Sequence, residues 1–267
     1  LIVSSLVSLP LVWLVHRQIR EPRRYLERRE AGDRPRIREL FAPGIRRRTL
    51  LLFCAQFLFV SAYAASIFLF PSFLREARGL ESFDFSVLIG AGNAIGILGY
   101  ILAAVVGEFV LTRRTTVVIW TLVGAALFQL LVWGTETFAQ MLAVYGLMSM
   151  FFYGGAAVKF AYLAEVFPTR LRATALSSCG SLAVSLGSAA GPLAVARGVE
   201  VLGWEVGYAA LVGAPLVIAG LLYLALTPVP SGLEVEEVEA LLQAGGRRGA
   251  AGPVKTNKEQ TMQGVRS

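Results

Sequence analysis

The chain has 267 residues, of which 55% are hydrophobic and 16% are charged. Soluble domains carry charge on about a quarter of their residues, so this composition excludes a surface exposed mainly to water and makes the lipid bilayer the expected partner. The net charge of +7 does not indicate nucleic acid, because the positive charge is spread over separate loops instead of one continuous patch.

Apolar segments dominate the chain from its first residue. A helix needs about 20 apolar residues to cross a bilayer, and continuously apolar runs are helices because lipid leaves no backbone group to water. The first run, Leu1–Val15, is short and lacks the basic start and cleavage site of a signal peptide. We therefore interpret residues 1–16 as the end of a transmembrane helix. The longer runs are Thr49–Leu74, Ser86–Leu111, Thr115–Trp133, Phe138–Ala164, Ala173–Ala196 and Gly207–Leu226.

This pattern predicts an all-α polytopic membrane protein with a six-helix bundle over residues 49–227. Residues 17–48 form an Arg-rich linker whose prolines, Pro22, Pro35 and Pro43, argue against one continuous helix. Residues 228–267 are expected to form a largely disordered tail, because their polar end has no apolar period.

Positive charge marks every second loop. Two later loops carry paired arginines, Arg113 with Arg114 and Arg170 with Arg172, whereas acidic residues balance the arginines of the intervening loops. The positive-inside rule then places the linker and the C-terminus in the cytoplasm. The chain is rich in Arg, Ala, Gly and Val, a composition typical of GC-rich bacterial genomes. We therefore expect the bacterial inner membrane as its location.

A charged run, Glu165-Val166-Phe167-Pro168-Thr169-Arg170-Leu171-Arg172, separates two of the long apolar segments. It resembles the loop between the fourth and fifth helices in the C-terminal half of sugar-porter-like members of the major facilitator superfamily. Pro168 prevents the first helix from continuing. Glu165 and Arg172 are therefore expected at adjacent helix ends.

Three other segments are similar to motifs of the same family. The run Gly107–Arg114 resembles its Gly-x-x-x-Asp-x-x-Gly-Arg-Arg loop, with Glu108 as the acid and Thr112 at the second glycine. The linker start, Glu21–Leu26, and the tail segment, Pro228–Val238, are similar to the motifs after the sixth and twelfth helices. The resemblance implies the C-terminal half of a twelve-helix carrier, whose partner is a missing N-terminal six-helix half.

The resemblance also implies a function. Such carriers move a small solute, here a sugar, an organic acid or a similar metabolite, by alternating access between two halves; coupling to H+ is left open. It further implies a cytoplasmic gate built from charged side chains, with interfacial topology charges as the alternative reading of the same residues. The expected gate residues are Glu108, Arg113, Arg114, Glu165, Arg170 and Arg172.

Lys159 is the first candidate for the substrate cavity, because an ionisable group inside a span is expected to be functional. Tyr145, Phe152 and Lys159 recur every seven residues and share a helix face with Ser149. By the resemblance this helix lines the cavity, where a lysine attracts an anionic substrate or pairs with a carboxylate of the missing half. The alternative is a lysine that snorkels to the cytoplasmic interface.

Gln56, Tyr63 and Asn93 are further cavity candidates. Gln56 and Tyr63 are seven residues apart on one helix and either bind substrate or form hydrogen bonds between helices. Asn93 lies among glycines that favour close helix packing, so it is either a ligand or part of that packing.

The sequence contains no Walker loop, zinc-ligand spacing or nucleophile elbow, so we predict no catalytic residue, no metal and no cofactor. A transporter is the leading hypothesis. The alternatives are a polytopic membrane enzyme, an accessory membrane subunit, or a truncated carrier fragment without function.

Overall fold

A computed structural model describes residues 36–168 and 170–226. The chain divides into two compact units after Arg36, and the described residues from Ile37 onward belong to the second. The expected helix end at residues 1–16, most of the linker and the expected tail at residues 228–267 lie outside the described residues.

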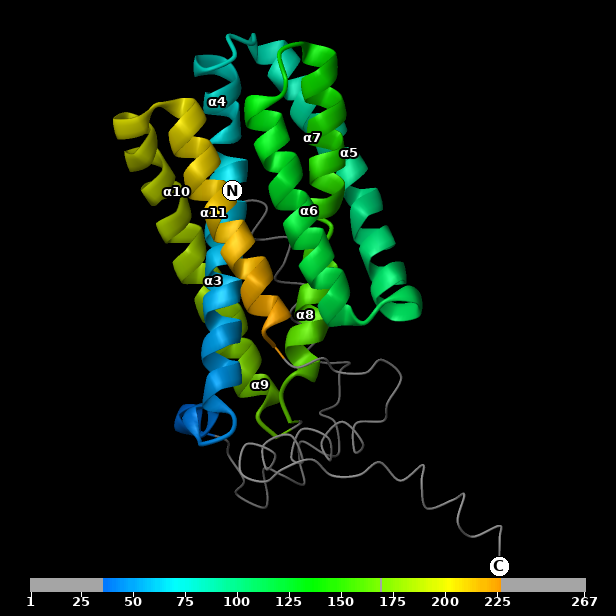
Figure 1. Cartoon of the computed structure of the whole chain (residues 1–267), viewed down its shortest axis with the longest axis vertical. Coiled ribbons are helices and arrows are strands. Elements are labelled where there is room, and N and C mark those ends of the chain that lie inside the picture. Colours follow the sequence, from blue (N-terminus) through cyan, green and yellow to red (C-terminus); the bar gives the residue numbers. More distant parts are fainter. Residues whose placement is uncertain (1–35, 169, 227–267) are drawn as a thin grey trace, which may run out of the picture. The chain divides into compact units, whose positions relative to one another are not determined.

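The described chain contains six helical segments that are long and apolar enough to cross a membrane, so the prediction of an all-α polytopic bundle is confirmed (Figure 1). Each of the six longer predicted apolar runs corresponds to one of them. In chain order the elements are the 3₁₀ helix η1 (Ile37–Phe41), α3 (Arg46–Phe68), α4 (Phe70–Glu76), α5 (Ser82–Val105), the π-helix η2 (Val106–Val110), α6 (Arg113–Trp133), α7 (Phe138–Phe152), α8 (Ala156–Glu165), α9 (Arg172–Ala175), the π-helix η3 (Leu176–Leu182), α10 (Ala183–Leu202) and α11 (Trp204–Leu224).

Several spans are interrupted, and local residues explain why. The first span breaks at Leu69, because Pro71 follows in the first turn of α4 and has no N–H for a continuous helix. The fourth breaks between α7 and α8 at Gly154 and Gly155. By contrast, Pro192 lies inside α10 and does not end the helix. Helices in membranes tolerate such a proline when neighbouring groups compensate the freed carbonyl.

The bundle is held together by a chain of helix contacts. Helix α3 packs against α10 and α11, α6 packs against α11 and α7, and α7 packs against α5. The rings of Phe59 and Tyr63 on α3 meet the ring of Phe152 on α7 at centroid distances of 5.6 and 6.0 Å. An aromatic core therefore also joins α3 directly to α7.

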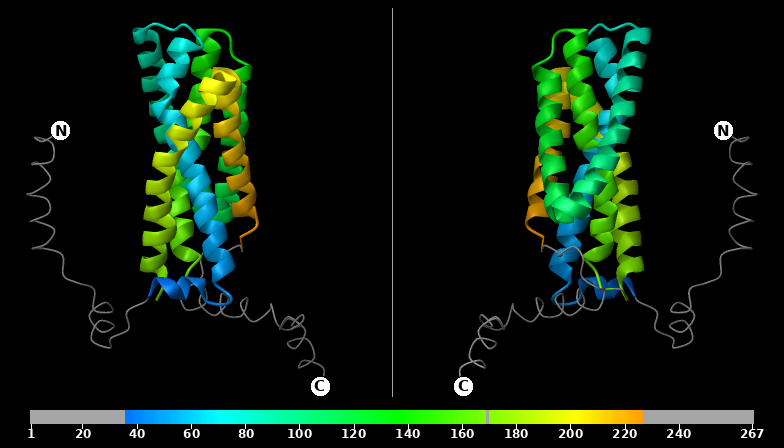
Figure 2. Two further views of the ribbon diagram at one scale, coloured as in Figure 1. Left: turned by 90° about the vertical axis from the view of Figure 1, so that its left-hand side faces the viewer. Right: turned by 90° about the vertical axis from the view of Figure 1, so that its right-hand side faces the viewer.

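The spans differ in how much of their surface the bundle covers. In their most apolar windows, 22% of the residues of α5 with η2 are buried, and 33% of those from α9 to α10, against 50–56% for the other four spans. In both views of Figure 2, α5 and α10 contribute to the edge of the bundle opposite α11. That edge is the part of the described surface with the least internal packing.

The two ends of the bundle carry different charged groups, and we name them by residue. The Glu165 end holds the start of α3, the turn between η2 and α6, and the turn between α8 and α9. The Arg78 end holds the turns before α5, between α6 and α7, and between α10 and α11.

Candidate functional site

Lys159 lies inside the bundle and not at its surface. The residue is 4% exposed, and its Nζ lies 2.7 Å from the centroid of the Phe59 ring. Among the described residues Nζ has no hydrogen-bond partner and forms no ion pair. The amine therefore lies against a ring face, and no carboxylate pairs with it among the described residues.

The turn before α8 creates the space that the amine occupies. A Cβ atom at Gly155 would lie 3.5 Å from Lys159 Nζ and 3.2 Å from Cβ of Trp120, so the lysine side chain folds back toward the start of its own helix. That is the direction in which helical side chains normally lean. The amine points away from Glu165 at the other end of α8, which argues against the snorkelling alternative.

The row of residues predicted from the seven-residue spacing faces α3 and α4. Tyr145 stacks on Phe70 with centroids 4.4 Å apart, Phe152 meets Phe59 edge to face, and Lys159 lies over Phe59. All three members of the row are buried. Their shared face is confirmed, and their role in binding a solute stays a prediction.

Sequence reasoning missed Phe59, Trp120 and Tyr153 as neighbours of this site. Phe59 lies three residues after Gln56 on the helix already singled out, so its spacing was available as a signal. Trp120 comes from α6, and its indole Nε1 is buried without a hydrogen-bond partner among the described residues. Tyr153 lies in the turn after α7, with its ring 5.2 Å from that of Tyr63.

The remaining cavity candidates have different surroundings. The Gln56 side-chain oxygen accepts a hydrogen bond of 2.8 Å from the Tyr223 hydroxyl on α11, which is the arrangement that the interhelical alternative predicts. Ser149 is fully buried on α7, and Tyr63 is partly buried among the rings. Asn93 is exposed on α5 and is not part of the group around Lys159.

At the Glu165 end, one arginine joins two carboxylates. Arg113 forms ion pairs with Glu108 and with Glu165, and its side chain is 22% exposed. It is the first residue of α6, and Glu165 is the last of α8. The hydroxyl of Thr112, where the resembling motif has glycine, accepts a 3.3 Å hydrogen bond from the N–H of Thr115. Thr112 thus caps α6 and fixes Arg113 at the helix start.

The other predicted gate residues have separate partners. Arg170 pairs with Glu39 of η1 at 2.5 Å, a partner that sequence reasoning did not identify. Arg114 donates to the carbonyl oxygen of Leu226 at 2.8 Å. Arg172 begins α9, next to the end of α8 as predicted, but it forms no ion pair with any described residue.

The comparison with known families agrees with this architecture. Residues 52–259 match the profile described as Major Facilitator Superfamily. The chain belongs to the Major Facilitator Superfamily. Together with the six apolar segments, this membership makes it a multi-pass membrane protein of the transporter kind. No curated protein matches the chain.

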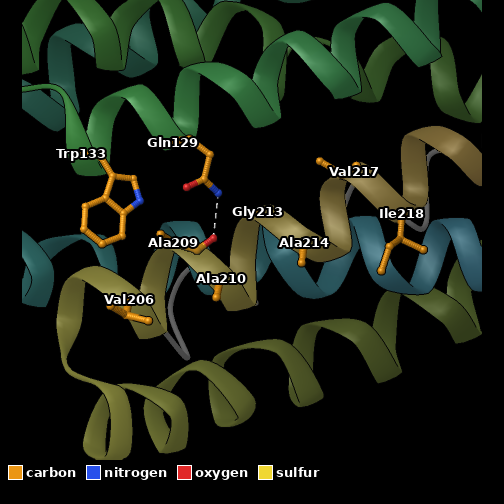
Figure 3. Close-up of a pocket in the computed structure, with 9 residues that line it drawn as sticks. All are labelled: Gln129, Trp133, Val206, Ala209, Ala210, Gly213, Ala214, Val217 and Ile218. Carbon is orange, nitrogen blue, oxygen red and sulfur yellow. Dashed lines mark hydrogen bonds between the residues drawn. The ribbon is translucent and has the colours of Figure 1, made fainter.

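This superfamily member also has an open groove of about 510 Å³ between α6 and α11. Figure 3 shows the Gln129 side chain turned toward α11, where its amide donates a 2.9 Å hydrogen bond to the Ala209 carbonyl oxygen. Apart from Trp133, the other lining residues are aliphatic or small. The groove has no charged side chain in its lining, so we do not assign the transport site to it. Its lining residues are Gln129, Trp133, Val206, Ala209, Ala210, Gly213, Ala214, Val217 and Ile218.

Proposed function

We propose that the protein carries a small solute across the membrane by alternating access, with α3, α7 and α8 facing the solute path. The observation that carries the proposal is Lys159, a buried amine without a counterion among the described residues. Such a group inside a transporter span is costly to keep. A role in binding the transported solute explains why it is there.

The proposal includes a second six-helix half as partner. Helices α5 and α10 have the least internal burial, and α5 exposes the amide of Asn93 along its length. Lipid offers no hydrogen bonds to an amide, whereas a second bundle does. We therefore propose that this face packs against the other half, with the solute path at the interface.

The gate is proposed at the Glu165 end, which we place on the cytoplasmic side of a bacterial inner membrane. The Arg113 side chain ties the start of α6 to the end of α8 through Glu165. Solvated ion pairs contribute about 1 kcal/mol or less, so they can break and form again during a transport cycle. Coupling of transport to H+ remains part of the same proposal.

Solute uptake by the intact carrier in membrane vesicles tests this proposal. Glu165→Gln should lower the maximal uptake rate several-fold while the half-saturating solute concentration changes little, because the pair acts on the conformational step. Lys159→Ala should change mainly the half-saturating concentration. Glu136→Gln, at an exposed position of the Arg78 end, is the matched control and should leave both unchanged.

Two results would count against the proposal. If Glu165→Gln weakened solute affinity and left the maximal rate intact, the gating role would be lost. If Lys159→Ala left every transported solute with unchanged uptake and affinity, the lysine would not belong to the solute path.

A further inference from the structure

We infer that the transported solute is an organic anion with a flat apolar body, which binds its charged group to Lys159 and its body to the rings around Phe59. This inference rests on the proposed transport function and specifies its substrate class. It follows from the charge, the donor groups and the ring geometry at one place in the bundle.

The charge of Lys159 is not balanced within the described chain. Burying an ammonium ion is costly, and a cation–π contact such as that with Phe59 offsets only part of that cost. Glu165 is six residues further along the same helix, or about 9 Å, and is engaged with Arg113. An anionic group beside Nζ would supply the missing compensation.

The unpartnered donor groups also favour an anion. Lys159 Nζ and Trp120 Nε1 are both buried without a hydrogen-bond partner among the described residues. Both residues border Gly155, where an added Cβ atom would lie 3.5 Å from Lys159 Nζ and 3.2 Å from Cβ of Trp120. An ammonium and an indole N–H can donate hydrogen bonds but cannot accept them, so a ligand that satisfies them must bring acceptor oxygens. A carboxylate or sulfonate has the required charge and oxygens.

The rings around the amine favour a flat body. Phe59 meets Phe152 at an interplanar angle of 88°, and Tyr63 meets Tyr153 at 80°. In the structure the Lys159 amine occupies the face of Phe59. When the amine turns to an anion, that ring face becomes available to an apolar body, and aromatic contacts of this kind are favourable.

A carboxylate from the proposed partner half is the competing explanation for the lysine. It would neutralise Lys159 permanently and leave no preference for anionic solutes. The two explanations therefore differ in the charge selectivity of the intact carrier, which a set of matched probes can measure.

The experiment measures binding of benzenesulfonate, its neutral analogue benzenesulfonamide, and methanesulfonate, which lacks the ring. The intact carrier is titrated by tryptophan fluorescence, and uptake of the same probes into proteoliposomes is measured separately. The variants are Lys159→Met, Lys159→Arg and Phe59→Leu. Phe68→Leu on the same helix, at a position 67% exposed, is the matched control.

We expect the unchanged protein to bind benzenesulfonate at least about tenfold more tightly than benzenesulfonamide, as hydrogen bonds to charged groups allow. Lys159→Met should remove this preference, and Lys159→Arg should retain part of it. Phe59→Leu should weaken benzenesulfonate more than methanesulfonate, and Phe68→Leu should change neither.

Equal affinity for the sulfonate and the sulfonamide, or a preference that survives in Lys159→Met, would overturn the inference. If Lys159→Met bound benzylammonium more tightly than benzenesulfonate and benzenesulfonamide, a carboxylate of the partner half would be indicated. That result would also overturn the inference. If Lys159→Met fails to fold, the probe series on the unchanged protein decides alone. Sulfonate binding without uptake of any solute would refute the transport function, whereas uptake of neutral solutes without sulfonate binding would refute the anion site.

Discussion

Substituting Gly99 of α5 tests the close packing of two helices in the bundle. A Cβ atom at Gly99 would lie 2.6 Å from Cα and 2.7 Å from the carbonyl carbon of Met150 on α7. These are backbone atoms, so no rotamer change relieves the overlap. Gly99→Ala must therefore move α5 away from α7, the helix against which α5 mainly packs.

The expected cost follows from that displacement. Overpacking by one methyl group typically destabilises a core by about 1–3 kcal/mol. Because the atoms that the new methyl group meets belong to the backbone of Met150, we expect Gly99→Ala to fall in the upper part of this range. For a protein of this size, 1 kcal/mol shifts the melting temperature by about 2–4 °C. We expect a decrease of about 4–10 °C in detergent, measured by fluorescence-detected size exclusion after heating.

Gly90→Ala is the matched control on the same helix. An added Cβ there meets no atom of the described chain within 4 Å, and alanine is the better helix former by about 1 kcal/mol. The control should melt at the same temperature as the unchanged protein or slightly above it. Equal melting temperatures for the two variants would refute the close approach of α5 and α7.

Three further predictions concern individual hydrogen bonds and ion pairs. Tyr223→Phe removes the donor to Gln56 and should lower stability by about 0.6–2 kcal/mol in thermal unfolding; unchanged solute affinity would support a packing role for Gln56, and a large loss would support a ligand role. Thr112→Ala should cost about 0.5–2 kcal/mol through loss of the α6 cap, and Thr112→Ser should restore most of it; equal melting of both variants would exclude the cap. Glu39→Gln should cost at most about 1 kcal/mol, because the Arg170–Glu39 pair is partly exposed, and 0.5 M salt should reduce the difference in melting temperature; a larger effect at high salt would contradict an electrostatic origin.

The sequence was sufficient for those features that depend on neighbours along the chain. Continuous apolar runs determined the six spans, and Pro168 separated the end of α8 at Glu165 from the start of α9 at Arg172. The glycine-rich part of α5 predicted close packing, which Gly99 shows against Met150. Each of these features follows from a spacing or a backbone restriction within one segment.

The features that the sequence could not predict depend on contacts between distant segments. The Arg170–Glu39 pair joins residues 131 positions apart, and many acidic residues were equally plausible partners. The direction of the Lys159 side chain depends on space above Gly155 and on rings from two other helices. A lysine near the end of a span is compatible with snorkelling or burial until those neighbours are placed.

Helix α8 links the proposed solute site to the proposed gate. It carries Lys159 near its start and Glu165 at its end. The two residues are therefore about 9 Å apart along the axis of one helix. The Gly154–Gly155 turn separates α8 from α7, and side-chain contacts occur at both of its ends: Phe59 at Lys159 and Arg113 at Glu165. In the proposed cycle, an anion that draws Lys159 from Phe59 therefore also changes the geometry of the Arg113–Glu165 pair. The proposed anion site and the proposed gate are therefore parts of the same helix.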